Sequence, residues 1–179
     1  MQQVKAKKAL GQHFLTDLSV AQRIADTVSE YKGSPVLEVG PGMGVLTQFL
    51  LQAGHDLTVV ELDTESVDYL NAVYPDELRD RIVSADFLKL DLKQTLGDGK
   101  MVIIGNYPYN ISSQIFFKVL DYRTKWCAAA ACSSARWRNA LRRVRAARPT
   151  AFCRCCCKRG TTLNTCSPWT RMCLIHHQR

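Results

Sequence analysis

Residues 36–44 read Val-Leu-Glu-Val-Gly-Pro-Gly-Met-Gly, and this stretch decides the fold. A short, mostly apolar run that opens into a glycine-rich turn predicts a buried strand followed by a backbone that can approach a ligand closely, because glycine has no Cβ. The glycines are spaced G-x-G-x-G, whereas the dinucleotide-binding fingerprint is G-x-G-x-x-G, so the match to NAD binding is imperfect. The stretch predicts a nucleotide-like cofactor at the end of a strand.

Strands and helices alternate on both sides of this turn. Apolar runs predict strands at 35–40, 57–62, 81–86 and 101–106, and helical spacing predicts helices at 18–28, 45–53, 64–73 and 111–122. Thr16 or Asp17 is suited to cap the first helix, which Gly33 stops, and Gly54 is suited to end the second. This alternation predicts an α/β fold, a Rossmann-like doubly wound sheet of parallel strands with helices on both faces.

The residues suited to binding fall at the ends of these four strands: Gly40, Glu61, Asp86 and Asn106. Ligands of open α/β sheets bind outside the carboxyl ends of the strands. Glu61 follows Gly40 by 21 residues and can accept hydrogen bonds from ribose hydroxyls, and Asp86 can accept one from an adenine amino group. Glu38, inside the first strand, either holds the turn or faces the cofactor. Each residue alone also has a purely structural explanation, such as capping a turn, so their joint order is the signal.

The strand at 101–105 leads directly into Asn106-Tyr107-Pro108-Tyr109. The Asn106 side-chain oxygen and the Pro108 carbonyl can both accept hydrogen bonds from an amine on a flat ring, and these dipoles stabilise positive charge that develops on its nitrogen. Tyr109 can stack on an extruded base, a contact worth about 1–3 kcal/mol. The structural alternative is a rigid turn. The motif predicts a catalytic site for a planar, amine-bearing acceptor.

These motifs resemble those of S-adenosylmethionine-dependent methyltransferases and, more narrowly, the ribosomal RNA adenine N6-dimethyltransferase family. The resemblance covers about residues 5 to 123 and is carried by the segments 8–15, 37–44, 60–63, 85–87 and 106–113. It implies methyl transfer from S-adenosylmethionine to N6 of adenines in small-subunit (16S) rRNA, during ribosome biogenesis. The partner is then small-subunit rRNA or the pre-30S particle, and the protein is expected to be a monomer without membrane contact.

The resemblance also assigns roles by position. The implied catalytic residues are Asn106, Pro108 and Tyr109. The implied cofactor-binding residues are His13, Leu15, Gly40, Glu61, Asp86 and Asn106, with no metal. Many family members carry Asn at the position of His13, and Tyr107 fills a variable position of the motif.

Three alternative functions stay open. Two are enzymatic, namely methylation of large-subunit rRNA of the antibiotic-resistance type, or of DNA adenine. The third is a non-catalytic RNA-binding relative of the same fold. The presence of Asn106, Pro108 and Tyr109 argues against that class, because binding alone does not need this motif.

The composition of the chain changes near Arg123. The chain has 179 residues, about the length of one domain, with 24 Lys and Arg against 16 Asp and Glu. All of the acids lie at or before Asp121, whereas twelve of the basic residues and all eight Cys follow residue 123. We therefore expect a methyltransferase core, partial, at 1–123 and a separate basic, Cys-rich and disordered tail at 124–179.

Three interpretations of the tail are open. The first is a zinc site formed by Cys153, Cys156, His176 and His177, although a second regular Cys pair is missing. An RNA-binding arm is the second, built on Arg142, Arg143, Arg145 and Arg148. The favoured hypothesis is an out-of-frame translation, since real sequences agree across levels of structure and this tail does not. A sheet truncated after about four strands would expose an apolar edge, which predicts aggregation and weak or absent activity.

The beginning of the chain adds two expectations. Lys5, Lys7 and Lys8 form a small basic arm that either touches RNA phosphate or is a solvated terminus. The absence of a signal-peptide core and of an apolar run of about 18 residues makes the cytoplasm the expected location.

Overall fold

The structure of the chain is a computed structural model that describes residues 17–92, 94, 99–107, 111–122, 126–132 and 171–175. The helices are α1 (Leu18–Asp26), η2 (Ser29–Tyr31, a 3₁₀ turn), α2 (Thr47–Gln52), α3 (Thr64–Val73) and α5 (Ser112–Asp121). The strands are β1 (Val36–Val39), β2 (Leu57–Glu61), β3 (Ile82–Ser84), β4 (Met101–Asn106), β5 (Trp126–Cys132) and β6 (Arg171–Ile175). All neighbouring strands are parallel, in the order β3-β2-β1-β4-β5-β6.

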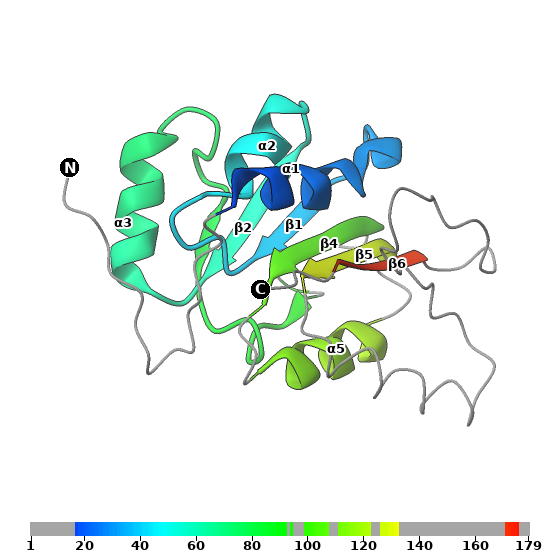
Figure 1. Cartoon of the computed structure of the whole chain (residues 1–179). Coiled ribbons are helices and arrows are strands. Elements are labelled where there is room, and N and C mark those ends of the chain that lie inside the picture. Colours follow the sequence, from blue (N-terminus) through cyan, green and yellow to red (C-terminus); the bar gives the residue numbers. More distant parts are fainter. Residues whose placement is uncertain are drawn as a thin grey trace, which may run out of the picture.

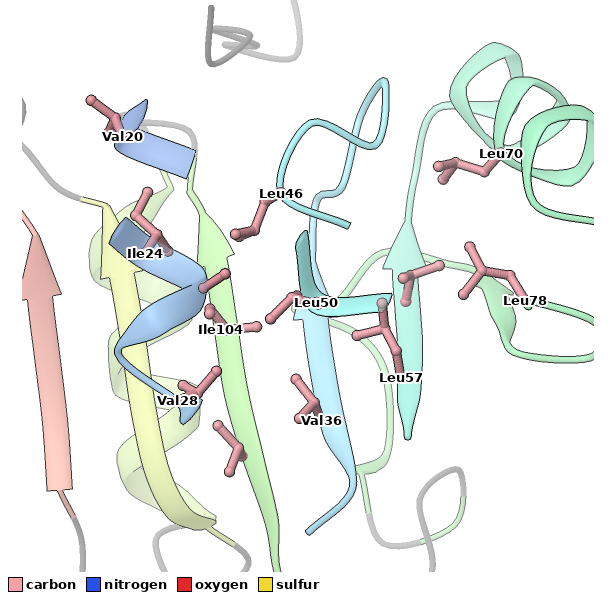
Figure 2. Close-up of a cluster of buried hydrophobic side chains, with 13 residues drawn as sticks. Val20, Ile24, Val28, Val36, Leu46, Leu50, Leu57, Leu70, Leu78 and Ile104 are labelled. Atoms are coloured by element: carbon pink, nitrogen blue, oxygen red, sulfur yellow. The ribbon is translucent and has the colours of Figure 1, made fainter. Parts of the chain in front are cut away.

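Helices cover both faces of this sheet (Figure 1). On one face, α1, α2 and α3 pack through a first core, whose members include Ile24, Leu50 and Leu70 (Figure 2). On the other face, α5 and the loop after β3 pack through a second core that includes Phe87, Ile115 and Val119. The strands supply alternate residues to the two cores, as expected for a parallel sheet buried on both sides.

The predicted fold class is confirmed, and most elements lie where the sequence placed them. The third helix and the fourth strand have the predicted bounds. The Asp17 side chain accepts a hydrogen bond from the Ser19 amide at 2.9 Å, so Asp17 is the N-cap of α1. The other six predicted elements are shorter than predicted by one to three residues, and α2 and β3 differ most. The glycine turn delays α2 until Thr47, and β3 stops at Ser84 because a new turn begins at Asp86.

The sheet differs from the sequence-based expectation in its extent. It does not end after β4, because β5 pairs with β4 from the Met101–Trp126 pair to the Asn106–Cys132 pair, with one shift of register between Met101 and Val102. The sixth strand then pairs with β5. Both added strands lie within the segment 124–179. Their parallel register leaves no open apolar edge at β4, on which the expectation of aggregation rested.

No helix in the described part of the chain is both long and apolar enough to cross a lipid bilayer.

Candidate functional site

The carboxyl ends of β1, β2, β3 and β4 lie at one edge of the sheet. Val39 of β1 is paired with Val60 of β2, and Glu61 of β2 is paired with Ser84 of β3. Asn106 is the last residue of β4, which runs parallel to β1 on its other side. The register therefore gathers four strand ends, and the residues that follow them, into one site.

The glycine turn after β1 is a left-handed backbone path with open space beside it. Gly40, Gly42 and Gly44 have φ of 70°, 55° and 73°, values that residues with a Cβ rarely adopt. A Cβ built on Gly40 meets nothing within 4 Å, so the turn leaves room for a ligand there. A Cβ on Gly44 would lie 3.0 Å from a ring carbon of Tyr74, so this glycine is needed for packing.

Glu61 ties the end of β2 to the glycine turn. Its Oε2 accepts a hydrogen bond from the Gly42 amide at 3.0 Å, and its Oε1 accepts from the amides of Leu62 at 2.8 Å and Asp63 at 2.9 Å. Only 6% of the residue is exposed. A carboxylate has about four acceptor positions, so one position remains in this arrangement for a ligand hydroxyl. The predicted contact of Glu61 with ribose hydroxyls stays a prediction.

Glu38 supports the glycine turn by joining β1 to the start of α2. The Thr47 hydroxyl, at the start of α2, donates a hydrogen bond to its Oε2 at 2.8 Å, and the residue is 1% exposed. Burial raises the pKa of Glu38 to about 8, the Thr47 hydrogen bond opposes this, and the charge of Glu61 adds to the rise. Of the two roles considered for Glu38, the structure supports holding the turn, since its carboxyl group is bonded to α2 and buried.

Asp86 begins the loop after β3. Its Oδ1 accepts a hydrogen bond from the Leu88 amide at 2.9 Å, and its main-chain carbonyl accepts from the amides of Lys89 and Leu90. The Asp86 side chain is 30% exposed, and its carboxylate lies 3.8 Å from the ammonium of Lys89, whose side chain is 86% exposed. From α5, Lys118 donates hydrogen bonds to the carbonyls of Leu88, at 2.9 Å, and Leu90. Asp86 is thus partly accessible on a loop that is braced from α5.

The residues at the end of β4 are closely packed against their surroundings. Asn106 is half-buried, and the next residue, Tyr107, is buried in the second core at 3% exposure. Burial raises the pKa of the Tyr107 hydroxyl well above its usual range. A Cβ on Gly105 would lie 2.4 Å from the Tyr107 ring and 2.5 Å from the Val39 carbonyl oxygen. Tyr107 therefore serves as an anchor that fixes Asn106 at the sheet edge.

The structure brings together some of the sequence-predicted site residues. Glu61 contacts the glycine turn directly. Asp86 follows β3 and Asn106 ends β4, two strands of the same sheet that are separated by β2 and β1. The remaining predicted site residues lie outside the described part of the chain: His13, Leu15, Pro108 and Tyr109. So do the basic arm at 5–8 and the Arg, Cys and His residues on which the zinc and RNA-arm interpretations rest. Among the described residues, no three His, Cys, Asp or Glu side chains gather as a metal site.

Two residues of this region were missed by sequence reasoning. Thr47 lies at a helix start where a capping role would be assumed, and its bond to Glu38 depends on tertiary structure. Lys118 carried a visible signal, because it falls between Ile115 and Val119 on the apolar face of the predicted helix. A charged residue in such a stripe indicates a specific polar partner.

Comparison with known proteins gives consistent matches. Residues 3–136 match the family model described as ribosomal RNA adenine dimethylase. The chain is 72% identical over 123 residues to ribosomal RNA small subunit methyltransferase A of Parabacteroides distasonis, covering 69% of this chain and 46% of the relative. Its namesake in Porphyromonas gingivalis is 64% identical over 124 residues, covering 69% and 48%. The chain thus spans about half the length of the curated relatives it matches.

Solved structures give the same fold. The crystal structure of the 23S rRNA methyltransferase ErmE superposes with a TM-score of 0.60 at 28% identity, covering 70% of this chain and 49% of that one. A dimethyladenosine transferase from Plasmodium falciparum superposes with a TM-score of 0.59 at 22% identity, covering 72% and 46%. The second likeness supports the fold alone.

Proposed function

The chain belongs to the ribosomal RNA adenine dimethylase family, and on that premise we propose that it transfers methyl groups from S-adenosylmethionine to N6 of adenines in small-subunit rRNA, giving N6,N6-dimethyladenosine. The observation that carries the proposal is the single sheet edge shared by the glycine turn, Glu61, Asp86 and Asn106. Relatives named for the small subunit are 55–72% identical, whereas ErmE, named for 23S rRNA, is 28% identical. This difference favours the small-subunit substrate over the large-subunit and DNA alternatives.

The residues at the sheet edge fit S-adenosylmethionine. The open space beside Gly40 admits a ligand close to the backbone. Glu61 has acceptor capacity for a ribose hydroxyl, and the partly exposed Asp86 carboxylate can accept from the adenine amine. We propose that His13 and Leu15 complete the site from the N-terminal segment. When bound, S-adenosylmethionine supplies an electrophilic methyl group on its sulfonium.

The chain's own residues orient the acceptor. An adenine N6 amine is a poor nucleophile, because its lone pair is delocalised into the ring. The Asn106 side-chain oxygen and the Pro108 carbonyl accept its two N–H groups, which favours a pyramidal nitrogen and stabilises the positive charge that develops there. Tyr109 stacks on the base after it leaves the RNA stack. No general base is needed before transfer, since the methylated amine is strongly acidic.

The proposed partner is small-subunit rRNA, free or in the pre-30S particle. The proposed state is a monomer in the cytoplasm, where ribosomal subunits are assembled. These proposals follow from the proposed substrate and from the family.

We also propose that 1–123 is the methyltransferase core and that 124–179 is an out-of-frame translation. The support is the loss of every acid and the gathering of all eight Cys beyond residue 123. Reading the encoding DNA in its other two frames tests this directly. If neither frame continues the methyltransferase pattern beyond residue 123, the hypothesis is wrong.

The experiment for the catalytic proposal is transfer of labelled methyl groups from S-adenosylmethionine to unmethylated small subunits. Asn106→Ala should reduce the transfer rate at least about 100-fold, because it removes an acceptor that acts on the developing charge. Binding of S-adenosylhomocysteine, measured by calorimetry, should survive at least in part.

The matched control is Asn71→Ala. Asn71 is an exposed residue of α3 whose side-chain amide donates to the Val67 carbonyl on the same helix. This variant should transfer methyl groups at the wild-type rate. Transfer by Asn106→Ala at a rate within a few-fold of wild type would contradict the proposed role.

A further inference from the structure

Lys118 is a charged residue on the buried side of α5. Its helix neighbours Ile115 and Val119 belong to the second core, and the Lys118 side chain is itself half-buried. The ammonium donates hydrogen bonds to the carbonyls of Leu88, at 2.9 Å, and Leu90. It also lies 5.5 Å from the centroid of the Phe87 ring, within the range of a cation–π contact. Lys118 thus contacts one loop at three places, namely the ring of Phe87 and the carbonyls of Leu88 and Leu90.

That loop carries Asp86. The Asp86 carboxylate accepts the Leu88 amide at 2.9 Å, and its carbonyl accepts the amides of Lys89 at 2.9 Å and Leu90 at 3.1 Å. The position of the carboxylate is therefore linked to the path of the backbone through 88–90. Lys118 fixes that path from a helix 28 to 30 residues away in the sequence.

The other cation near Asp86 cannot do the same. Lys89 lies 3.8 Å from the Asp86 carboxylate, but its side chain is 86% exposed. Exposed ion pairs are screened by solvent and restrain their partners weakly. Hydrogen bonds from a charged, half-buried donor are among the stronger ones.

We propose that Lys118 is a positioning residue that holds the loop after β3 so that Asp86 selects adenine in the cofactor. This inference rests on the proposed function, since it assumes that Asp86 accepts the cofactor's amino group. The same helix begins just after the segment that carries the proposed acceptor motif. Lys118 therefore fixes the cofactor loop to the element that follows the acceptor site.

The first test is base selectivity. Calorimetry gives the Kd of S-adenosylhomocysteine and of S-inosylhomocysteine, in which an oxygen replaces the amine that donates to Asp86. The wild-type chain should prefer the adenine ligand. Lys118→Met should reduce that preference about tenfold or more, because a hydrogen bond to a charged group contributes at least this factor. A merely structural defect would weaken both ligands by the same factor and leave the preference unchanged.

Two further variants serve as controls for the effect of Lys118→Met. Lys118→Arg keeps charged donors at the position and should recover part of the preference. Lys89→Met makes the same substitution on the exposed neighbour and should retain the wild-type preference. If Lys118→Met retains it as well, or if wild type binds both ligands equally, the inference is overturned.

The second test needs no ligand. Hydrogen exchange of the Leu88, Lys89 and Leu90 amides should become faster in Lys118→Met, with β1 and β2 unchanged. Unchanged exchange in this loop would overturn the holding role. If wild type binds neither ligand, the proposed function fails instead, and the exchange rates still decide whether Lys118 holds the loop.

Discussion

Glu38 shows how one residue can serve a site without touching a ligand. Its carboxyl group is 1% exposed and accepts the Thr47 hydroxyl, which joins β1 to the start of α2 beneath the glycine turn. Because burial raises its pKa to about 8, the group is mainly protonated at neutral pH. Ionisation therefore places a charge in an apolar interior and weakens the support of the turn.

This gives a prediction for stability against pH. Folded Glu38 has the higher pKa, so between pH 4.5 and 8 the folded state binds more protons than the unfolded state. The free energy of unfolding should fall as pH rises, with a slope of up to about 1.4 kcal/mol per pH unit from this group. Glu38→Gln should remove that slope while keeping an acceptor for Thr47. Urea unfolding of both proteins at several pH values measures this slope.

The control for this series is Glu77→Gln, at an exposed position. It should leave the pH profile of the wild type unchanged. An identical profile in Glu38→Gln would mean that Glu38 is charged in the folded protein.

At the scale of an element, β4 depends on one small residue. Gly105 lies where a Cβ would be 2.5 Å from the Val39 carbonyl oxygen of β1 and 2.4 Å from the Tyr107 ring. The backbone atom belongs to a paired strand, so it cannot move aside easily. The absence of a side chain therefore lets β4 end close to β1 and lets Tyr107 turn into the core.

Gly105→Ala should destabilise the protein by about 1–3 kcal/mol, as overpacking of a core does. It should also weaken cofactor binding, because Asn106 follows directly. Gly99→Ala is the matched control, since a Cβ there meets nothing within 4 Å. Chemical denaturation of both variants measures the difference, and equal stabilities would contradict the close approach.

At the scale of the molecule, the sheet continues past the composition break. The strand β4 is buried along Met101–Gly105 and pairs with β5, which pairs in turn with β6. A buried central strand whose edge is opened offers unpaired backbone groups to another chain.

A chain ended at residue 123 should therefore self-associate. Light scattering after size-exclusion chromatography should show aggregates for this variant under conditions in which the full chain shows fewer. A truncated chain that stays monodisperse and unfolds at the same temperature would show that β5 and β6 contribute nothing to the protection of β4.

The sequence alone predicted much of this protein, because its strongest signals are local. Four apolar strands, the helices between them and the placement of Gly40, Glu61, Asp86 and Asn106 at strand ends follow from short-range patterns. The motifs also led to the family that the comparisons confirm. The extension of the sheet by β5 was not predictable, since Ala128–Ala131 carries no strand pattern of its own and gains its partner only from β4.

Tertiary structure decided which groups meet. Three contacts show this: Glu61 accepts a hydrogen bond from the glycine turn, Glu38 accepts one from Thr47, and Lys118 donates to the loop that carries Asp86. They join residues separated by 9 to 30 positions. Such contacts depend on register and burial, which no local pattern encodes. The sequence by itself determined which chemistry is present and at which strand ends. Only the packed sheet decided what holds those residues in place, because desolvation and hydrogen bonding act between distant segments once they are brought together.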